Sequence, residues 1–170
     1  MNRPVPIKPA KDQESVWDYP RPPRLEPSSK RIEIISAGVN IVDSSRAFRV
    51  LETSHPPVFY IPVVDIKASY LELATGSSFC EWKEAASYYN LRIGAHFVPE
   101  VAWFYPEPSQ TFATIKDHVA FYASRIQLLE SDGCFVNGER VVPQPGNFYG
   151  GWITNDIVGP FKGKVGSMGW

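Results

Sequence analysis

Proline sets the strongest limit on how this chain folds. Sixteen of its 170 residues are Pro, and seven of these precede Ser28. Each Pro lacks a backbone N–H and restricts the residue before it, so this segment excludes a helix and a central strand. We therefore expect residues 1–29 to form an extended N-terminal arm, held against the rest of the chain by Trp17 and Tyr19, whose rings need burial.

Between residues 30 and 142, short apolar segments alternate with polar residues and are separated by turn residues. Apolar side chains at every second position are typical of strands that are half buried in a sheet. The dipeptide Asn137-Gly138, between Cys134–Val136 and Glu139–Val142, favours the type I′ turn of a β-hairpin. We expect a first hairpin over residues 31–42, with its turn at Ala37-Gly38, and another turn at Thr75-Gly76. Further strands are expected over 58–61, 66–73, 78–83, 86–93, 102–105, 119–122 and 126–129.

Two short segments favour helices instead. Asp43–Ser45 supplies N-cap oxygens, and Ala47, Val50 and Leu51 follow at i, i+3, i+4 spacing, which predicts a short amphipathic helix. A further helical turn is expected over residues 110–117. Strands at short intervals with so few helices indicate a single mainly β domain, α+β at most, built from antiparallel strands.

The end of the chain differs from the domain in composition. Residues 143–170 hold seven of the twelve Gly together with the aromatic residues Phe148, Tyr149, Trp152 and Phe161. Exposed rings promote aggregation, so we expect an irregular C-terminal tail wrapped on the domain. Two sharper alternatives are a flap over a pocket and an arm that joins two copies of the chain into a homodimer.

The net charge of -1 excludes some classes of partner. Nucleic-acid binders carry dense basic patches, which this near-neutral chain lacks, so we expect no nucleic-acid partner. Apolar runs here stay far below the roughly 20 residues that span a bilayer, so we expect no membrane insertion. The first fifteen residues lack the apolar core of a secretory signal, and we expect a cytoplasmic location.

Residues that bind nucleotides or metals do not occur at the required spacing. The sequence contains no G-x-x-x-x-G-K-[ST] loop, no G-x-G-x-x-G fingerprint and no G-x-S-x-G serine-hydrolase elbow. Cys80 and Cys134 are not in C-x-x-C spacing, so a tetrahedral zinc site would need His55, His96 and His118 to approach them in the fold. We expect no metal, no cofactor and no disulfide, and we interpret Cys134 as a small core residue.

Three polar residues are the weak catalytic candidates. Glu52 and His55 stand beside prolines that fix the backbone, in the kind of loop where functional groups are often placed. Their plainer interpretation is that Glu52 is solvated and His55 satisfies carbonyls at a helix end. Cys80 is a candidate nucleophile, but strand alternation over 78–83 is expected to turn Lys83 away from its thiol.

Aromatic residues are the best pointer to a binding function. Many of them are adjacent in predicted strands, and strand alternation places the two members of each pair on opposite faces of a sheet. A single core cannot hold them all. The surplus implies either a second buried face or an aromatic-lined pocket. The segments that carry these rings are Phe59-Tyr60, Trp82, Tyr88-Tyr89, Trp103–Tyr105 and Phe121-Tyr122.

Sequence blocks in a fixed order resemble a known family. They read RAFRVLE from Arg46, PPVFYIP from Pro56, FCEWK from Phe79, AWFYPEP from Ala102, VAFY from Val119 and VNGE from Val136. Over residues 30–142 the chain resembles the family catalogued as domain of unknown function 427, which some catalogues label nucleotidyltransferase-like. The resemblance implies a compact mainly β domain, similar to a β-tent or a small sandwich. The two extensions resemble a longer form found in cyanobacteria and some other microbes.

The resemblance also carries over a set of positions. In that family Gly usually follows the lysine of the cysteine motif, whereas Glu84 follows Lys83 here. The polar and aromatic positions that match the family pattern are Glu52, Tyr60, Cys80, Lys83, Trp103, Tyr105 and Tyr122.

Our leading hypothesis is a non-enzymatic module that binds a small molecule or a partner protein. Its site would be an aromatic-lined pocket between the sheet and the tail, with Glu52 and Lys83 as polar anchors. The alternative is an enzyme of hydrolase, redox or nucleotidyl-transfer type that uses Cys80 or the Glu52–His55 pair. The candidate ligand-binding residues are Glu52, Tyr60, Lys83, Trp103, Tyr105 and Tyr122.

Overall fold

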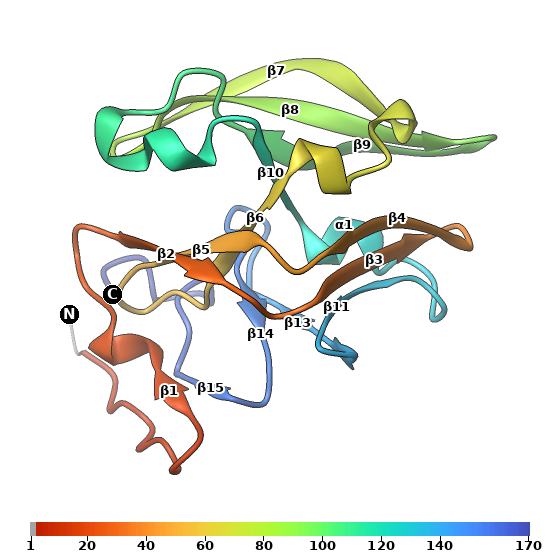
Figure 1. Ribbon diagram of the computed structural model, residues 1–170. Helices are drawn as coiled ribbons and strands as arrows, with labels where there is room; N and C mark the ends of the chain where they lie inside the picture. Colours follow the sequence, from red (N-terminus) through yellow and green to blue (C-terminus); the bar gives the residue numbers. More distant parts are fainter. Residues whose placement is uncertain (1–2) are drawn as a thin grey trace.

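Two antiparallel sheets make up most of the computed structural model, which describes residues 3–170 (Figure 1). The larger sheet has seven strands, in the order β2 (Arg24–Ser28), β5 (Ala47–Leu51), β6 (Val58–Pro62), β10 (His118–Phe121), β9 (His96–Phe104), β8 (Glu84–Ile93) and β7 (Leu71–Cys80). The smaller sheet has four, in the order β12 (Glu139–Arg140), β11 (Gly133–Val136), β3 (Ile32–Ser36) and β4 (Val39–Ser44). The mainly β, antiparallel fold class that the sequence predicts is confirmed.

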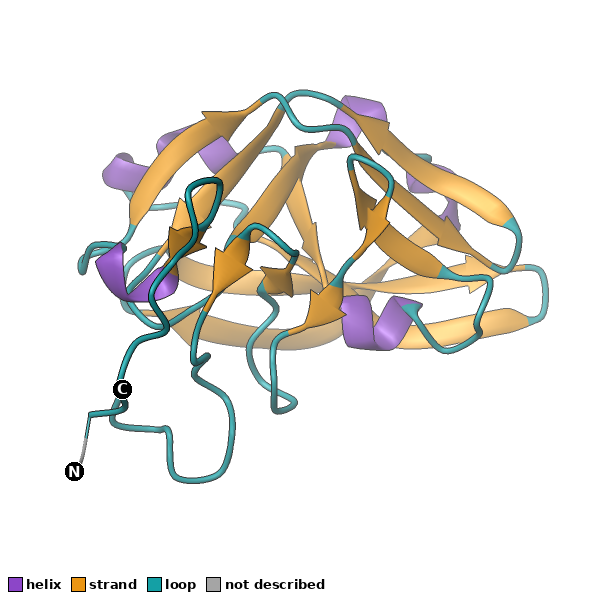
Figure 2. Cartoon of the chain, turned by 90° about the horizontal axis from the view of Figure 1, so that it is seen from below, coloured by secondary structure: helices purple, strands orange, loops and turns teal. Residues whose placement is uncertain are grey.

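The remaining elements are short (Figure 2). One α-helix, α1, spans Ala123–Ile126, and the 3₁₀ turns are η1 (Val16–Asp18), η2 (Val63–Asp65), η3 (Ala68–Tyr70) and η4 (Gln110–Ile115). Two small sheets pair β1 (Glu14–Ser15) in parallel with β15 (Ile157–Val158), and β13 (Val142–Pro143) antiparallel with β14 (Trp152–Ile153). Within residues 3–170, none of the helices has the length and apolar character needed to cross a membrane.

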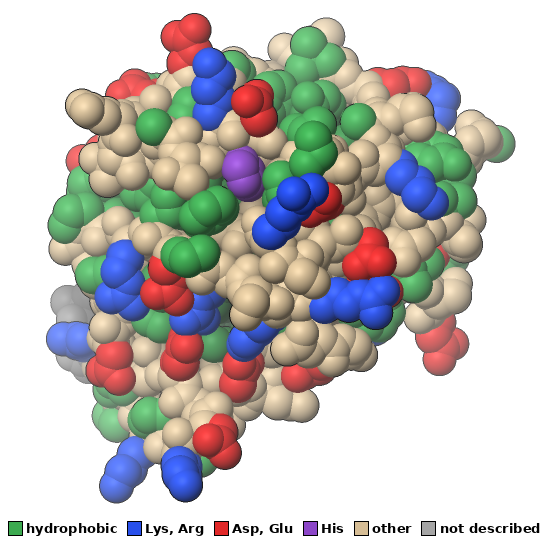
Figure 3. All heavy atoms as spheres, in the orientation of Figure 1, with side chains coloured by type: hydrophobic (Ala, Val, Ile, Leu, Met, Phe, Trp, Pro, Cys, Tyr) green, Lys and Arg blue, Asp and Glu red, His purple; other side chains and the backbone are tan. Residues whose placement is uncertain are grey.

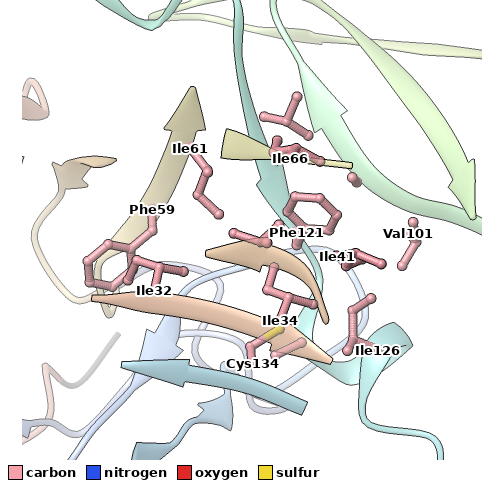
Figure 4. Packing of buried hydrophobic residues seen from close by; sticks show 14 of the residues in the cluster. Ile32, Ile34, Ile41, Phe59, Ile61, Ile66, Val101, Phe121, Ile126 and Cys134 are labelled. Carbon is pink, nitrogen blue, oxygen red and sulfur yellow. The ribbon is translucent and has the colours of Figure 1, made fainter. Parts of the chain in front are cut away.

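The main core lies between the two large sheets (Figure 4). Phe59 on β6 and Phe121 on β10 point from the seven-stranded sheet toward Ile32 and Ile34 on β3. All four side chains are at most 4 % exposed. Cys134 on β11 lies in this core as a fully buried residue, as the sequence predicts, and burial raises the pKa of its thiol.

A second core covers the opposite face of the seven-stranded sheet. Strand alternation explains it, because Tyr60 follows Phe59 on β6 and Tyr122 follows Phe121 after β10, so the second ring of each pair faces away from the main core. Trp103 on β9 joins the same face. The aromatic surplus of the sequence thus fills a second buried face, whose buried members are Val50, Tyr60, Ala86, Trp103, Tyr105, Phe112, Ile115, Ala120 and Tyr122.

The sequence prediction of a helix over 43–51 was wrong, because Ala47–Leu51 is strand β5, paired with β2 and β6. Both faces of β5 are covered: Ala47 belongs to the main core and Val50 to the second core. Burial on two sides removes the polar–apolar alternation that marks a strand. The apolar residues of β5 then have the i, i+3, i+4 spacing that is typical of a helix.

Three further predictions needed correction. The strand predicted over 126–129 does not form: Ile126 ends α1, a turn follows, and Leu128 and Leu129 are exposed. The segment 66–73 contains the turn η3 before β7 begins at Leu71. The predicted turn at Thr75-Gly76 lies inside β7, where the register with β8 shifts between Leu73 and Ser77. The predicted hairpins at Ala37-Gly38 and Asn137-Gly138 are confirmed by the pairing of their flanking strands.

The N-terminal arm and the C-terminal tail lie on the same side of the molecule and contact each other (Figures 1 and 2). Val16, Trp17 and Tyr19 are buried against Leu51 and Ile157. Trp17 Nε1 donates to the carbonyl of Pro160 at 2.9 Å. The sequence predicted an extended arm here, and its last part, Arg24–Ser28, is an edge strand, a position that tolerates Pro27.

Candidate ligand-binding site

A cavity of about 390 Å³ lies between the second core and the C-terminal tail. We call it the aromatic cavity. Its wall contains every residue that the sequence suggested for catalysis or binding, namely Glu52, His55, Tyr60, Cys80, Lys83, Trp103, Tyr105 and Tyr122. The fold therefore brings together side chains that are up to 70 positions apart in the sequence. Their binding of a ligand stays a prediction.

Side chains on or just after β6, β9 and β10 form the centre of the aromatic wall, and Tyr88 on β8 also lines the cavity. Trp103 on β9 lies with its ring centroid 4.5 Å from that of Tyr122, and its Nε1 donates to the hydroxyl of Tyr60 at 3.3 Å. The ring of Tyr105 is 6.3 Å from that of Tyr60. Burial raises the pKa of the Tyr122 phenol to about 12 and raises the pKa of Tyr60 and Tyr105 as well. These phenols are neutral near pH 7 and can donate hydrogen bonds.

Lys83 also lines the aromatic cavity, which corrects the prediction that it turns away from Cys80. The prediction assumed a strand through residue 83, but β7 ends at Cys80 and a turn follows. The backbone N–H of Lys83 donates to the carbonyl of Cys80 at 3.3 Å, and the side chain lies against the rings of Tyr105 and Phe112. Glu84, at the position where the resembling family has Gly, has a φ of +80°, a conformation that glycine adopts without strain.

The side chain of Lys83 is largely buried and has no anionic partner among residues 3–170. The residue is only 8 % exposed, and its Nζ stands 5.8 Å from the ring centroid of Tyr105 and 5.4 Å from that of Phe112. Within residues 3–170, Nζ makes no ion pair and no hydrogen bond. Cation–π contacts contribute about 0.5–2 kcal/mol each, whereas burying an ion costs several kcal/mol. The charge of Lys83 is therefore incompletely compensated.

The C-terminal tail forms the wall opposite the sheet. Of the tail aromatics named from the sequence, Phe148 and Tyr149 line the cavity, and the structure adds Gln144, Gly150 and Lys162. A methyl group at Gly150 would lie 2.2 Å from Cη2 of Trp103, so glycine is needed where the tail backbone meets this ring. The hydroxyl of Tyr122 donates to the carbonyl of Phe148 at 3.4 Å and links the sheet to the tail.

Gln144 fixes the tail to His55. Its Oε1 accepts from the backbone N–H of Gly151 at 3.0 Å, and its Nε2 donates to the carbonyl of Lys162 at 2.9 Å. These two backbone groups fix the orientation of the amide. The same Nε2 lies 3.0 Å from Nδ1 of His55, so Nδ1 accepts and the proton of the neutral imidazole is on Nε2. That N–H faces Oε2 of Glu52 at 3.5 Å.

Glu52 is neutralised by a residue of the N-terminal arm. Nη2 of Arg21 lies 3.2 Å from Oε2 of Glu52 and donates to the carbonyl of Thr53 at 2.8 Å. Sequence reasoning did not identify Arg21, because a contact between positions 31 residues apart leaves no local pattern. Glu52 thus has charged and polar partners on the protein, unlike Lys83.

Buried His55 makes stability depend on pH. Burial, with Lys162, Arg21 and Lys83 nearby, lowers the pKa of His55 from 6.5 to about 3. The unfolded chain then binds a proton that the folded chain does not, so acid favours unfolding between these two values. We expect the free energy of unfolding to fall by about 2 kcal/mol from about pH 7 to about pH 5 because of this residue.

Urea unfolding of the wild type and of His55→Gln at both pH values measures this dependence. Between pH 7 and pH 5, the free energy of unfolding of the variant should fall by about 2 kcal/mol less than that of the wild type. An identical slope for the two proteins would mean that His55 is not buried in its neutral form.

The structure separates the residues that a zinc site would require. Cys134 lies in the main core and Cys80 lines the aromatic cavity, on the other side of the seven-stranded sheet. Of the three histidines, only His55 is on the cavity wall. Over residues 3–170, no group of three or more His, Cys, Asp or Glu side chains is placed to hold a metal ion.

The outer surface has no obvious single-sign charged region on the side seen in Figure 3, where Lys and Arg side chains are interspersed with Asp and Glu. Nucleic-acid binding needs clustered basic charge. This face therefore offers no electrostatic reason to look for a site outside the aromatic cavity.

Comparison with known proteins shows that some cavity residues lie inside a matched family segment and others lie beyond it. No curated protein matches the sequence. A family model described as a domain of unknown function, DUF427, matches residues 24–134, from the start of β2 to Cys134 on β11. The sheet side of the aromatic cavity lies within this segment, and the tail residues from Gln144 to Lys162 lie beyond it. Because the match covers more than half of its length, the chain belongs to the DUF427 family.

Proposed function

We propose that this protein is a non-enzymatic module that binds a small ligand in the aromatic cavity. The observation that carries the proposal is a space of about 390 Å³ with aromatic side chains on both its sheet side and its tail side. Small-molecule sites typically have volumes of about 300–1,000 Å³ and combine apolar walls with a few polar groups. The ligand would have a planar or apolar body that lies against Trp103 and Tyr122.

Binding is favoured over catalysis by the state of the polar side chains. A general base needs a free lone pair, but Nδ1 of His55 already accepts from Gln144, and its Nε2 carries the proton. Glu52 is engaged by Arg21. The alternative enzyme that uses Glu52 and His55 would need this network to open before proton transfer.

A panel of small naphthalene and indole compounds, neutral and charged, tests the proposal by thermal shift and calorimetry. We expect members of the panel to bind the wild type with a stoichiometry of one. Trp103→Ala should weaken that binding at least about tenfold, because stacking area against the ligand is lost. Phe97→Ala is the matched control, since Phe97 is exposed on β9 outside the cavity and should leave affinity unchanged.

Alkylation of the wild type gives a second readout that needs no variant to fold. Cys80 lines the aromatic cavity, whereas Cys134 is fully buried in the main core, so reaction with iodoacetamide reports mainly on Cys80. A compound bound in the cavity should slow this reaction. The proposed function is wrong if no member of the panel binds. It is also wrong if a bound compound does not slow the alkylation of Cys80 and Trp103→Ala binds it as tightly as the wild type does.

A further inference from the structure

The charges around the aromatic cavity define a class of ligand, an inference that rests on the proposed function. Three of the four charged side chains in the wall have partners or are open to solvent. Lys162 donates from Nζ to the main-chain oxygen of Trp170 at 3.3 Å, Glu52 pairs with Arg21, and Glu81 is solvent-exposed. Lys83 is the exception.

Lys83 combines burial, position and lack of a partner. It is 8 % exposed, it lines the cavity, and among residues 3–170 no carboxylate lies within 4.0 Å of its Nζ. The nearby rings of Tyr105 and Phe112 attract the Lys83 cation, but they carry no net negative charge that could form an ion pair with it. A buried charge is normally paired, so the missing anion is expected from outside the chain.

We propose that the ligand of the aromatic cavity is a small planar organic acid, a monoanionic carboxylate, whose acid group pairs with Nζ of Lys83. The rings of Trp103 and Tyr122 receive its apolar body. Lys83 is the cavity lysine whose Nζ has no hydrogen-bond partner among residues 3–170, and this one cation matches one negative charge. A phosphate ester carries up to two charges and a nucleoside triphosphate more, whereas the other lysine of the wall, Lys162, already donates to the main-chain oxygen of Trp170.

Isothermal titration with three matched probes tests this inference. The probes are 2-naphthoate, its neutral isostere 2-naphthamide, and 2-naphthyl phosphate. We expect the wild type to bind the carboxylate at least about tenfold more tightly than the amide, as a desolvated charge-assisted hydrogen bond allows. The phosphate should bind more weakly than the carboxylate, because its second charge has no partner.

Substitution of Lys83 tests whether its ammonium group causes the preference for the carboxylate. Lys83→Met keeps the length of the side chain and removes the charge, so it should abolish the preference for the carboxylate and leave amide binding within about threefold. Without ligand it should also unfold at a higher temperature than the wild type, because an unpaired buried charge is gone. Lys116→Met is the matched control, because Lys116 is exposed outside the cavity, and it should keep the preference.

The outcomes separate this inference from the proposed function. Equal binding of carboxylate and amide by the wild type, an unchanged preference in Lys83→Met, or tighter binding of the phosphate would overturn the carboxylate class alone. If none of the naphthalene and indole compounds binds, the proposed function itself fails. Should Lys83→Met not fold, Lys83→Arg takes its place: this variant keeps the cation and must retain a preference for the carboxylate.

Discussion

Replacing Gln144 by Leu should lower the free energy of unfolding by about 2–6 kcal/mol, because it leaves two buried groups, on Gly151 and His55, without a partner, and each costs about 1–3 kcal/mol. The Gln144 side chain bonds three groups: the backbone N–H of Gly151, the carbonyl of Lys162 and Nδ1 of His55. Gln144 is only 3 % exposed, so water cannot readily replace it. Leucine fills a similar volume but offers none of these hydrogen bonds.

Urea denaturation measures this loss, and Gln110→Leu is the matched control. Gln110 is exposed at the start of η4, so its replacement should change stability by no more than about 0.5 kcal/mol. Because Gln144 holds the tail over the cavity, Gln144→Leu should also make Cys80 react faster with iodoacetamide. A stability loss below about 1 kcal/mol would show that the amide network contributes little to folding.

Trp152→Ala should be comparably destabilising, by about 3–5 kcal/mol, because large-to-small changes in a packed core lose burial and leave a cavity. Trp152 is 1 % exposed and joins the tail to the main core. Its ring centroid is 5.5 Å from that of Phe59, and its Nε1 donates to the carbonyl of Phe121 at 3.0 Å. The tail is thus anchored in the main core near the aromatic cavity.

Two further variants separate the contributions of Trp152. Trp152→Phe keeps most of the packing but loses the indole donor, so we expect an intermediate loss of about 1–3 kcal/mol. Phe148→Ala is the matched control in the same tail, since Phe148 is 73 % exposed and its loss should cost no more than about 0.5 kcal/mol. If Trp152→Ala unfolds at nearly the same urea concentration as Phe148→Ala, the tail is not part of the main core.

Local sequence pattern was sufficient to predict a second buried aromatic face on the larger sheet. Period-two alternation over 58–61 and 119–122 places Tyr60 and Tyr122 on one face, and both lie in the second core. The Asn137-Gly138 turn has φ values of +48° and +82°, the positive values that a type I′ turn requires. These features depend on neighbours in sequence, so one sequence suffices to recognise them.

Contacts between residues far apart in the sequence determine the parts of the fold and of the site that local pattern did not predict. Strand β5 is buried on both faces, so its helix-like spacing was misleading. Lys83 faces the cavity because β7 ends three residues earlier, and the resulting backbone gives Glu84 its positive φ. Gln144 reaches His55 across 89 positions, and Arg21 reaches Glu52 across 31. Such long-range partners leave no periodic signal.

We propose that the aromatic cavity holds a planar acid. An electron-density map of the complex with 2-naphthoate tests this binding most directly. We predict density for the naphthalene ring against Trp103 and Tyr122, with a carboxylate oxygen about 2.7–3.2 Å from Nζ of Lys83. Both ring side chains and this lysine line the same cavity. A map in which 2-naphthoate lies outside the cavity, or in which the cavity stays empty at saturating concentration, would contradict the account.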